Sequence, residues 1–485
     1  MIISNQSKGL LLNKHNTFKA AISRFSSSGP TRQPLLSIDD DLMDKDYQEE
    51  VSKHLKDLKA YPSYSNILNP QHFYQNQVLM EYLQKRPHPV SLRQLAGFGK
   101  TLTKQKILSS ANFVRLELPI RLAMRIRDLQ TLPFGVVNNV HFAKIYESYY
   151  HLFNAFRKIP TIKTLDDNQK FCRTLSQMLD DHVFNLSNLM MGALEISIVS
   201  DLSQEELDQF MSSILRSRIS RRVIVEEHLS LTENYKTSPY SSKPPDFIGE
   251  IFHQCRAADH LNIVGDLLKD SMMDGYHNKE HMPDLELHGD LNATCPFLVP
   301  HLHYLFGEIL RNSFEATIKT HGKDLSTKLP PIKILIIDSS NEIVFKISDF
   351  GGGMKHEEMK DIWSFKKKQD LAKQYLSNFH ALPGLSILPD PMELTNSSQS
   401  YTLQILKEPI LGRASSIFTK QSTLETLIKR PHEYRLGLGL PMCKVYADYW
   451  NGDLLMNSIQ GYGTDTCLRL TKLGYYSNNI QLDRA

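Results

Sequence analysis

The chain has 485 residues, of which 41% are hydrophobic and 22% charged, and its formal net charge is +3. This length and composition fit two or three globular domains, and the near balance of charge gives no support for wholesale nucleic-acid binding. The five cysteines are scattered without a CxxC pair, which argues against a disulfide framework or a zinc site, and no apolar run approaches the roughly 20 residues that span a bilayer.

The N-terminal stretch differs from the rest of the chain. Residues 1–38 contain no Asp or Glu, hold five Lys or Arg residues and several serines, and place Leu11, Phe18, Ile22 and Phe25 on one helical face. A basic, acid-free, amphipathic segment is typical of a mitochondrial transit peptide, and a disordered basic tail is the alternative. We expect residues 1–38 to be a targeting segment, with mature-type sequence starting at the acidic run 39–41.

Residues 45–235 carry the pattern of a helical bundle. Apolar residues recur at spacings of three and four from Phe113 to Leu129 and again from Phe171 to Phe184. Pro119 lies inside the first run and is expected to kink or restart that helix. Strand signals are few, so the prediction is an N-terminal domain of long helices, ending at the Pro/Ser-rich run of residues 236–246.

Residues 246–475 show a mixed pattern that predicts an α/β domain. The expected elements are helices over 254–273 and 300–321, strands over 332–337 and 343–347, a helix opened by the glycines of 437–439, and a final hairpin of 453–458 with 464–470. Residues 354–436 show little periodicity. A segment of that length inside a domain is expected to be a functional lid or disorder.

The run ISDFGGGM at residues 347–354 raises the question of whether Asp349 belongs to the DFG triplet of the common protein kinases. That fold requires a Gly-rich loop with a lysine strand, and then an HRD motif, before the DFG. This chain has no HRD, and its Gly-rich run at 437–439 follows the DFG. The context therefore argues against the common protein-kinase fold.

The run HLHYLFGEILRNSFEATI places three polar side chains on one helix face. Glu308, Asn312 and Glu315 follow the spacing i, i+4, i+7. A carboxamide oxygen suits a Mg²⁺ ion that takes the rest of its ligands from water and phosphates. A carboxylate one turn earlier can orient or deprotonate a hydroxyl. The alternative is an ordinary solvated helix face.

Three further features are compatible with a nucleotide site. Asp349 ends a predicted strand and precedes three glycines. A carboxylate in this position can accept a hydrogen bond from an adenine amino group, and a tight turn after the strand is an equally good interpretation. Gly437 and Gly439 would leave backbone amides free at a helix N-terminus, a natural place for phosphate. Thr464 could set its hydroxyl beside Asp349, or could belong to a plain hairpin turn.

The order of these features resembles the N, first-glycine, second-glycine and GT boxes of the ATPase superfamily that includes histidine kinases, heat-shock chaperones and mismatch-repair ATPases. A narrower similarity, to the mitochondrial pyruvate dehydrogenase kinases and branched-chain 2-oxoacid dehydrogenase kinases, is carried by VSLRQLAGFG, VRLELPIRLAMRIRDLQTLP, SRISRRVIVEEH, PPIKILIIDSSNEIVFKISDFGGGM and GLPMCKVYADYWNGDLLMNSIQGYGTD. The similarity covers about residues 85–475, and the chain resembles a divergent member of fungal type.

That resemblance implies a protein serine kinase of the mitochondrial matrix that uses ATP and Mg²⁺. Its helical bundle, residues 45–235, would dock on the lipoyl domain of the acyltransferase core of a 2-oxoacid dehydrogenase complex. Residues 246–475 would form a histidine-kinase-like ATP-binding α/β sandwich with an enlarged lid at 354–436. Family members dimerise through their ATP domains, so a homodimer or a heterodimer with a related kinase is expected.

The substrate implied by the resemblance is the α subunit of the decarboxylating component of the pyruvate dehydrogenase complex, which phosphorylation inactivates. Two alternatives stay open: a kinase of the branched-chain complex and a non-catalytic regulatory partner of such a kinase. Neither a nucleic-acid partner nor a membrane span is expected.

The resemblance also implies roles for single residues. Carried over by position, Glu308 is the expected general base, Asn312 the Mg²⁺ ligand and Asp349 the adenine partner. The other residues expected to contact the nucleotide are Arg311, Glu315, Gly351, Gly353, Arg435, Leu436, Gly437, Leu438, Gly439, Leu440 and Thr464.

Some positions depart from the family pattern. Tyr304 stands where the family has a histidine that tunes the catalytic Glu, and a tyrosine can still hydrogen-bond a carboxylate. Glu315 replaces an arginine, and Arg435 replaces the first glycine of the Gly-rich run. Lys366–Lys368 stand near the place of a Ser-Thr pair and either meet phosphates or form a solvated face. His228 lacks the proline that follows a phosphoacceptor histidine, which disfavours a protein-histidine kinase.

Overall fold

The computed structural model describes residues 70–137, 139–181, 183–199, 202–240, 242–243, 247–272, 282–322, 328–382, 423–431 and 434–474. The expected transit peptide and most of the expected lid lie outside these residues. None of the helices in the described ranges is long and apolar enough to cross a membrane.

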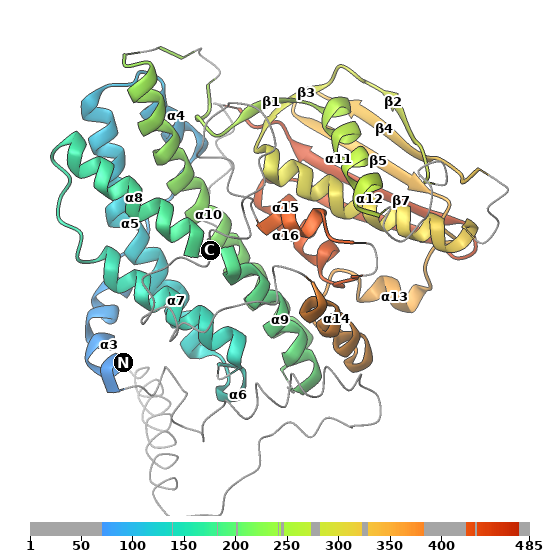
Figure 1. Ribbon diagram of the computed structural model, residues 1–485, viewed down its shortest axis with the longest axis horizontal. Coiled ribbons are helices and arrows are strands. Elements are labelled where there is room, and N and C mark those ends of the chain that lie inside the picture. Colours follow the sequence, from blue (N-terminus) through green and yellow to red (C-terminus); the bar gives the residue numbers. More distant parts are fainter. Residues whose placement is uncertain are drawn as a thin grey trace, which may run out of the picture. The chain divides into compact units, whose positions relative to one another are not determined.

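The first half of the described chain consists of helices, as predicted. They are α3 (Pro70–Leu83), α4 (Leu92–Gly99), α5 (Lys104–Thr131), α6 (Phe134–Val137), α7 (Val140–Phe156), α8 (Leu165–Asp181), α9 (Val183–Val199) and α10 (Gln204–Thr237) (Figure 1). The predicted apolar runs are the core: Leu118, Leu122 and Ile126 are fully buried, where α5 packs against α7 and α10. The apolar face of α5 that the sequence pattern predicts is therefore the face that packs in the core of the helical region.

Helix α5 corrects one expectation. It continues for 28 residues through Pro119 and ends only at Thr131, so the proline does not restart the helix. Thr103 caps its first turn by accepting a hydrogen bond from the Lys106 N–H at 3.3 Å. The cost of a proline inside a helix is local, whereas the buried stripe extends to both sides of Pro119. Tertiary packing outweighs the local break in this case.

The second half of the described chain forms an α/β region. Its helices are α11 (Ala257–Met272), α12 (Val299–His321), α13 (His356–Lys360), α14 (Gln369–Ala381), α15 (Thr423–Ile428) and α16 (Gly439–Tyr449). Its strands are β1 (His253–Arg256), β2 (Leu285–Gly289), β3 (Thr294–Phe297), β4 (Ile332–Asp338), β5 (Glu342–Asp349), β6 (Asp453–Ile459) and β7 (Gly463–Thr471). The predicted helices, strand pair and final hairpin are confirmed to within a few residues, but β1, β2 and β3 were not predicted.

The main sheet has five strands in the order β2-β4-β5-β7-β6, and only the β2–β4 pair is parallel. Strands β1 and β3 form a separate antiparallel pair. Side chains on one face of the main sheet, such as Ile334, Phe345 and Leu468, are fully buried. Figure 1 shows α11 and α12 along this sheet, and Phe306 of α12 stacks edge-to-face on Phe345 with ring centroids 4.9 Å apart. The opposite face exposes Leu335 and Leu455 to 39% and 54%.

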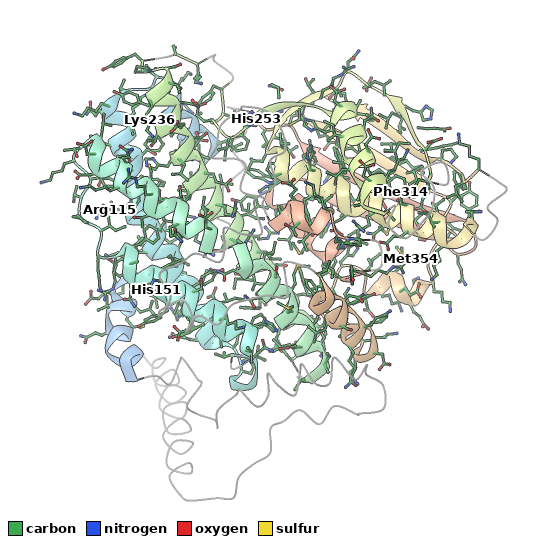
Figure 2. The ribbon with its side chains drawn as sticks, in the orientation of Figure 1. Arg115, His151, Lys236, His253, Phe314 and Met354 are labelled. Atoms are coloured by element: carbon green, nitrogen blue, oxygen red, sulfur yellow. The ribbon has the colours of Figure 1, made fainter. Side chains whose placement is uncertain are left out.

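One set of contacts between the helical and α/β regions involves α10, and α14 and α15 pack against α9. The Glu227 carboxylate accepts the backbone N–H groups of Glu250 and Ile251 at 2.9 and 3.2 Å, so it holds the segment that leads into β1. Arg216 of α10 pairs with Asp448 of α16 at 3.6 Å. Figure 2 marks Lys236 at the end of α10 and His253 at the start of β1, on either side of the boundary proposed from sequence.

A second connection runs from the chain after α13 back to the helices. Asp208 of α10 accepts hydrogen bonds from the Ser364 hydroxyl at 3.1 Å and the Phe365 N–H at 2.6 Å. Lys366 donates its ammonium to the Leu202 carbonyl at 2.5 Å, and the Lys367 N–H donates to the Ser197 hydroxyl at 3.2 Å. We call residues 364–367 the anchored segment. The solvated-face alternative is wrong for Lys366 and Lys367, and burial lowers the pKa of Lys367 to about 8, whereas Lys368 is exposed.

Candidate functional site

Helix α12 positions the acidic and amide side chains that the sequence singled out. It starts at Val299 with a proline in its first turn and packs Leu302, Phe306 and Leu310 into the core. Glu308 is also buried, with 2% of its surface exposed, whereas Asn312 and Glu315 are half-buried. The alternative of a solvated helix face is therefore wrong for Glu308. A buried carboxylate requires a partner, and the structure supplies one.

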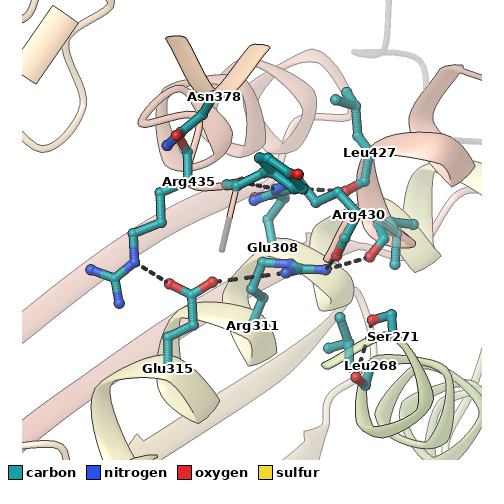
Figure 3. A network of polar contacts seen from close by, with 11 residues as sticks. Leu268, Ser271, Glu308, Arg311, Glu315, Asn378, Leu427, Arg430 and Arg435 are labelled. Carbon is teal, nitrogen blue, oxygen red and sulfur yellow. Dashed lines mark hydrogen bonds and ion pairs between the residues drawn. The ribbon is translucent and has the colours of Figure 1, made fainter. Parts of the chain in front are cut away.

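That partner is Arg430, which follows α15. Its Nη1 donates to Glu308 Oε1 at 2.5 Å and its Nη2 donates to Oε2 at 3.0 Å, so the two planar groups meet along two parallel bonds (Figure 3). The side chains are 6% and 3% exposed. Burial alone would lower the pKa of Arg430, but the Glu308 carboxylate raises it above its ordinary value. Bidentate geometry of this kind is the strongest form of a charge-assisted hydrogen bond.

The chain around Arg430 is fixed to α12 from both sides. Arg430 Nε donates to the Tyr434 carbonyl at 3.2 Å, and Nη1 also donates to the Leu427 carbonyl at 2.6 Å. From α12, Arg311 Nη2 donates to the carbonyls of Ile428 and Arg430 at 2.7 and 2.6 Å. The segment that leads into the glycine run is thus attached to the turn of α12 that carries Glu308.

Glu308 also contacts the glycine run itself. Helix α16 begins at Gly439, as the sequence predicted, and a Cβ atom added there would lie 2.1 Å from Glu308 Oε2. Only glycine allows the helix N-terminus to approach the carboxylate this closely. Gly437 has a φ of +69° and lies against the ring of Tyr375 from α14. The side chains of Leu436 and Leu438 are buried, so the backbone is the part of this run that a ligand could contact.

Two of the departures from the family pattern lie together. Arg435 Nε donates to Glu315 Oε2 at 2.9 Å, and the Arg435 carbonyl accepts a hydrogen bond from Asn378 of α14 at 2.7 Å. Glu315 is 11% exposed and Arg435 49% exposed. The ion pair links α12, α14 and the glycine run at one place.

Asp349 lies at the end of β5 and is connected to α12. Its Oδ2 accepts the Ser313 hydroxyl at 3.1 Å and its Oδ1 accepts the Gly351 N–H at 2.9 Å. Burial raises the pKa of this carboxyl. Thr464 is its cross-strand neighbour on β7, but the Thr464 hydroxyl hydrogen-bonds Ser458 Oγ at 2.9 Å.

The glycines after Asp349 serve two purposes. A Cβ at Gly351 would lie 2.4 Å from Ala316 Cβ, so this glycine lets the chain approach α12. Gly353 has a φ of +63°, in line with the expectation of left-handed backbone. Together they bend the chain away from the sheet.

Asn312 and Thr317 have polar atoms that are not used by the described protein. The Asn312 side chain makes no hydrogen bond to any described residue. Thr317 Oγ1 is buried without a hydrogen-bond partner among the described residues, one turn beyond Ser313. The described ranges hold no cluster of three His, Cys, Asp or Glu side chains around a potential metal. A metal held mainly by water and phosphate oxygens, with one amide from the protein, fits this donor set.

Sequence reasoning missed Arg430 and Tyr375. Neither lies in a periodic pattern or next to a recognisable motif, and each reaches the site from a segment distant in sequence. It also expected that Tyr304 can hydrogen-bond the carboxylate of Glu308. The structure instead directs the Tyr304 hydroxyl to Met442 Sδ at 3.5 Å, within a fully buried setting that raises the pKa of the phenol.

His228 is a structural residue in this fold. It is 1% exposed, and its ring nitrogens contact the Ser110 hydroxyl and the Asn168 carboxamide oxygen, each at 3.0 Å. Burial lowers the pKa of this histidine to about 3. A neutral, enclosed imidazole with both nitrogens bonded is a poor phosphoacceptor, which agrees with the sequence argument against a histidine kinase.

A cavity of about 350 Å³ lies in the helical region, between α4 and α5. Its lining is mainly apolar, with Val90, Phe98 and Phe113, and includes the polar side chains of Gln94, Lys106 and Ser109. It lies apart from the residues on α12 and forms a second candidate site.

Comparison with known proteins gives consistent matches. A family model described as mitochondrial branched-chain alpha-ketoacid dehydrogenase kinase matches residues 89–252. Pyruvate dehydrogenase (acetyl-transferring) kinase 2, mitochondrial, of Saccharomyces cerevisiae is 42% identical over 458 residues, covering 90% of this chain and 93% of the relative. The corresponding kinase of Arabidopsis thaliana is 26% identical over 386 residues, 79% of this chain and 90% of the relative. Human isozyme 4 is 26% identical over 404 residues, 80% of this chain and 82% of the relative.

Proposed function

Because the chain belongs to the family of mitochondrial pyruvate dehydrogenase kinases, we propose that it phosphorylates a serine of the α subunit of the pyruvate dehydrogenase complex and thereby inactivates the complex. By its family the chain is a protein serine kinase that uses ATP. The further parts of the proposal are the substrate serine, the Mg²⁺ requirement, the roles of single residues and a location in the mitochondrial matrix.

The observation that carries this proposal is the position of α12. One turn of this helix brings Glu308 into contact with Gly439 at the N-terminus of α16, and a later turn joins Asp349 through Ser313. The residues proposed as the base, the phosphate-binding helix end and the adenine partner therefore all lie on α12 or contact it.

The chain's own residues would divide the work of phosphoryl transfer as follows. The free amides at the start of α16 would contact phosphate oxygens. Asp349 would accept a hydrogen bond from the adenine amino group. Glu308 would orient the serine hydroxyl and accept its proton as the oxygen attacks phosphorus. Asn312 would hold Mg²⁺, which when bound neutralises charge on the phosphates.

Two surfaces are assigned within the same proposal. The cavity between α4 and α5 would receive the lipoyl group of the acyltransferase core, because its apolar wall and the Lys106 at its edge suit an apolar chain with a polar end. The open face of the main sheet, with Leu335, Ile337 and Leu455 exposed, would form the dimer contact between ATP domains.

The branched-chain 2-oxoacid dehydrogenase complex is the second candidate substrate. The description of the matched family model favours it, whereas the names of the more extensive matches favour pyruvate dehydrogenase. A non-catalytic regulatory partner is the third candidate, but the pairing of Glu308 and the contacts of Asp349 favour an enzyme.

The test is to incubate the purified full chain with each purified complex and labelled ATP. The proposal expects label in the α subunit of the pyruvate dehydrogenase component, with loss of complex activity in proportion to the label. Label confined to the branched-chain complex would replace the substrate. Tight ATP binding with no transfer to either complex would favour the regulatory partner.

A further inference from the structure

The proposed general base has to be held in one orientation if it is to accept the proton of the serine hydroxyl. The Glu308 side chain is 3% exposed and packs beneath the backbone of Gly439. A buried carboxylate requires hydrogen-bond donors from the protein. The donors that the structure supplies therefore decide how Glu308 is oriented.

The neighbours of Glu308 leave one strong candidate. Tyr304 on α12 and Cys443 on α16 both face the carboxylate, and burial raises the pKa of each well above its ordinary value, so both stay neutral. Arg311, one turn away, interacts with Glu308 through its charge, but its Nη2 donates to the backbone carbonyls of Ile428 and Arg430. Only Arg430, among the described residues, donates hydrogen bonds to both carboxylate oxygens.

We propose that Arg430 is the positioning residue of the catalytic base, and that its two hydrogen bonds hold the Glu308 carboxylate in one plane for the serine hydroxyl. This inference rests on the proposed function, since it assumes that Glu308 is the base. Each carboxylate oxygen has two lone pairs, so an oxygen that accepts one bond from Arg430 can still accept the substrate hydroxyl. Tyr304, which occupies the place of the family's tuning histidine, bonds Met442 and leaves this role to Arg430.

Arg430 also ties the chain of residues 427–434 together, so its role as a positioning residue has to be separated from a purely structural one. Arg311 provides the matched control. It attaches the same segment to the same helix through two backbone carbonyls, but donates no hydrogen bond to Glu308. Substitution of Arg311 therefore loosens the segment while the Glu308–Arg430 pair stays.

The experiment compares Arg430→Met, Arg430→Lys and Arg311→Met in the full chain, acting on the dehydrogenase complex. The kcat, the KM for ATP and the ATP dissociation constant by calorimetry are measured, together with thermal unfolding. Arg430→Met is expected to lower kcat about 10- to 100-fold while the ATP dissociation constant changes less than about threefold, since a base typically supplies about 10²- to 10⁴-fold. Arg430→Lys should recover part of kcat, because a lysine keeps the positive charge beside Glu308. The recovery should be incomplete, because a lysine lacks the planar guanidinium that donates two parallel hydrogen bonds.

Arg311→Met should affect ATP binding more than catalysis. We expect a raised KM for ATP and a kcat that falls less than in Arg430→Met. If Arg430→Met gives the same pattern as Arg311→Met, Arg430 is only a structural residue. A kcat that is unchanged or raised in Arg430→Met also overturns the proposal, the latter because the pair would then restrain the base. If Arg430→Met does not fold, Arg430→Lys decides: a lowered kcat with normal ATP affinity supports positioning, and a normal kcat overturns it.

Glu308→Gln in the same assay distinguishes a failure of the proposed mechanism from a failure of the role given to Arg430. Full activity of Glu308→Gln means that Glu308 is not the base, and the proposed mechanism fails first. Loss of activity in Glu308→Gln with normal kcat in Arg430→Met leaves the proposed function intact and removes only the role of Arg430.

Discussion

Glu315 of α12 and Arg435 of the glycine run form an ion pair, with Oε2 and Nε 2.9 Å apart. Both residues depart from the pattern that the sequence resembles: one replaces an arginine on the helix, the other a glycine in the loop. The structure shows that the two departures are neighbours with opposite charges. The glycine run thus carries a cation that the pattern lacks, and this cation pairs with the anion that the helix carries, so the two departures together add no net charge.

This compensation predicts a charge-swap result. Glu315→Lys would set a third cation beside Arg435 and Arg311. We expect the like charges to push Arg435 away from α12, which would distort the glycine run and so raise the KM for ATP. The cost in unfolding free energy should stay below about 1 kcal/mol, since Arg435 is half exposed and solvent screens the pair. The double variant with Arg435→Glu restores the opposite charges and should recover most of the ATP affinity. Calorimetry with ATP checks this, and a double variant no better than the single one contradicts it.

Glu308→Gln is expected to abolish phosphoryl transfer while ATP binding is retained. The amide keeps the size of the side chain and cannot accept a proton, so the loss should be about 10²- to 10⁴-fold in kcat. Transfer of labelled phosphate to the α subunit measures the rate, and calorimetry measures ATP binding. Normal transfer by the variant would rule out Glu308 as the base.

Asn312→Ala is expected to weaken binding of Mg-ATP and to leave binding of metal-free ATP almost unchanged. The reason is that its carboxamide has no hydrogen-bond partner among the described residues, so its removal leaves the protein's own network intact. Titration of ATP with and without magnesium gives the two affinities. An equal loss in both titrations would indicate that Asn312 contacts the nucleotide directly.

Glu227 predicts a pH dependence of stability. Burial raises its pKa from 4.5 to about 8 in the folded chain, so the folded state holds a proton that the unfolded state has lost. Its contribution is complete below pH 4.5 and declines as pH rises towards 8, by up to about 1.4 kcal/mol per pH unit. Glu227→Gln should flatten this decline because it keeps a hydrogen-bond acceptor and removes the titration. Urea unfolding from pH 5 to pH 8 measures both slopes, and equal slopes would contradict the prediction.

The sequence predicted those parts of the site that depend on local spacing. Glu308 and Asn312 share a helix face because positions i and i+4 of a helix always do. The glycine run predicts a turn before a helix because a glycine such as Gly437 adopts a positive φ without strain, and α16 begins two residues later at Gly439. The strand before Asp349 was predicted from the β-branched and aromatic residues of 343–347. These features need no knowledge of the rest of the chain.

The parts that sequence reasoning missed depend on contacts between distant segments. Arg430 contacts Glu308 from 122 positions further along the chain. The sequence around Arg430 contains no motif that would predict its pairing with a buried carboxylate. Strands β1 and β3 have four residues each, too few to show a period, and they exist because they pair with one another. Of the prediction that Pro119 kinks or restarts its helix, the restart was wrong, because the packing of α5 on α7 and α10 outweighs the local effect of a proline.

The anchored segment couples the chain beside the glycine run to the helical region. Asp208, Ser197 and the Leu202 carbonyl attach residues 364–367 to α9, α10 and their connection. Helix α14, which follows, also packs against α9. Because Tyr375 and Asn378 of α14 contact Gly437 and Arg435, a shift of α9 would be transmitted mechanically to the glycine run.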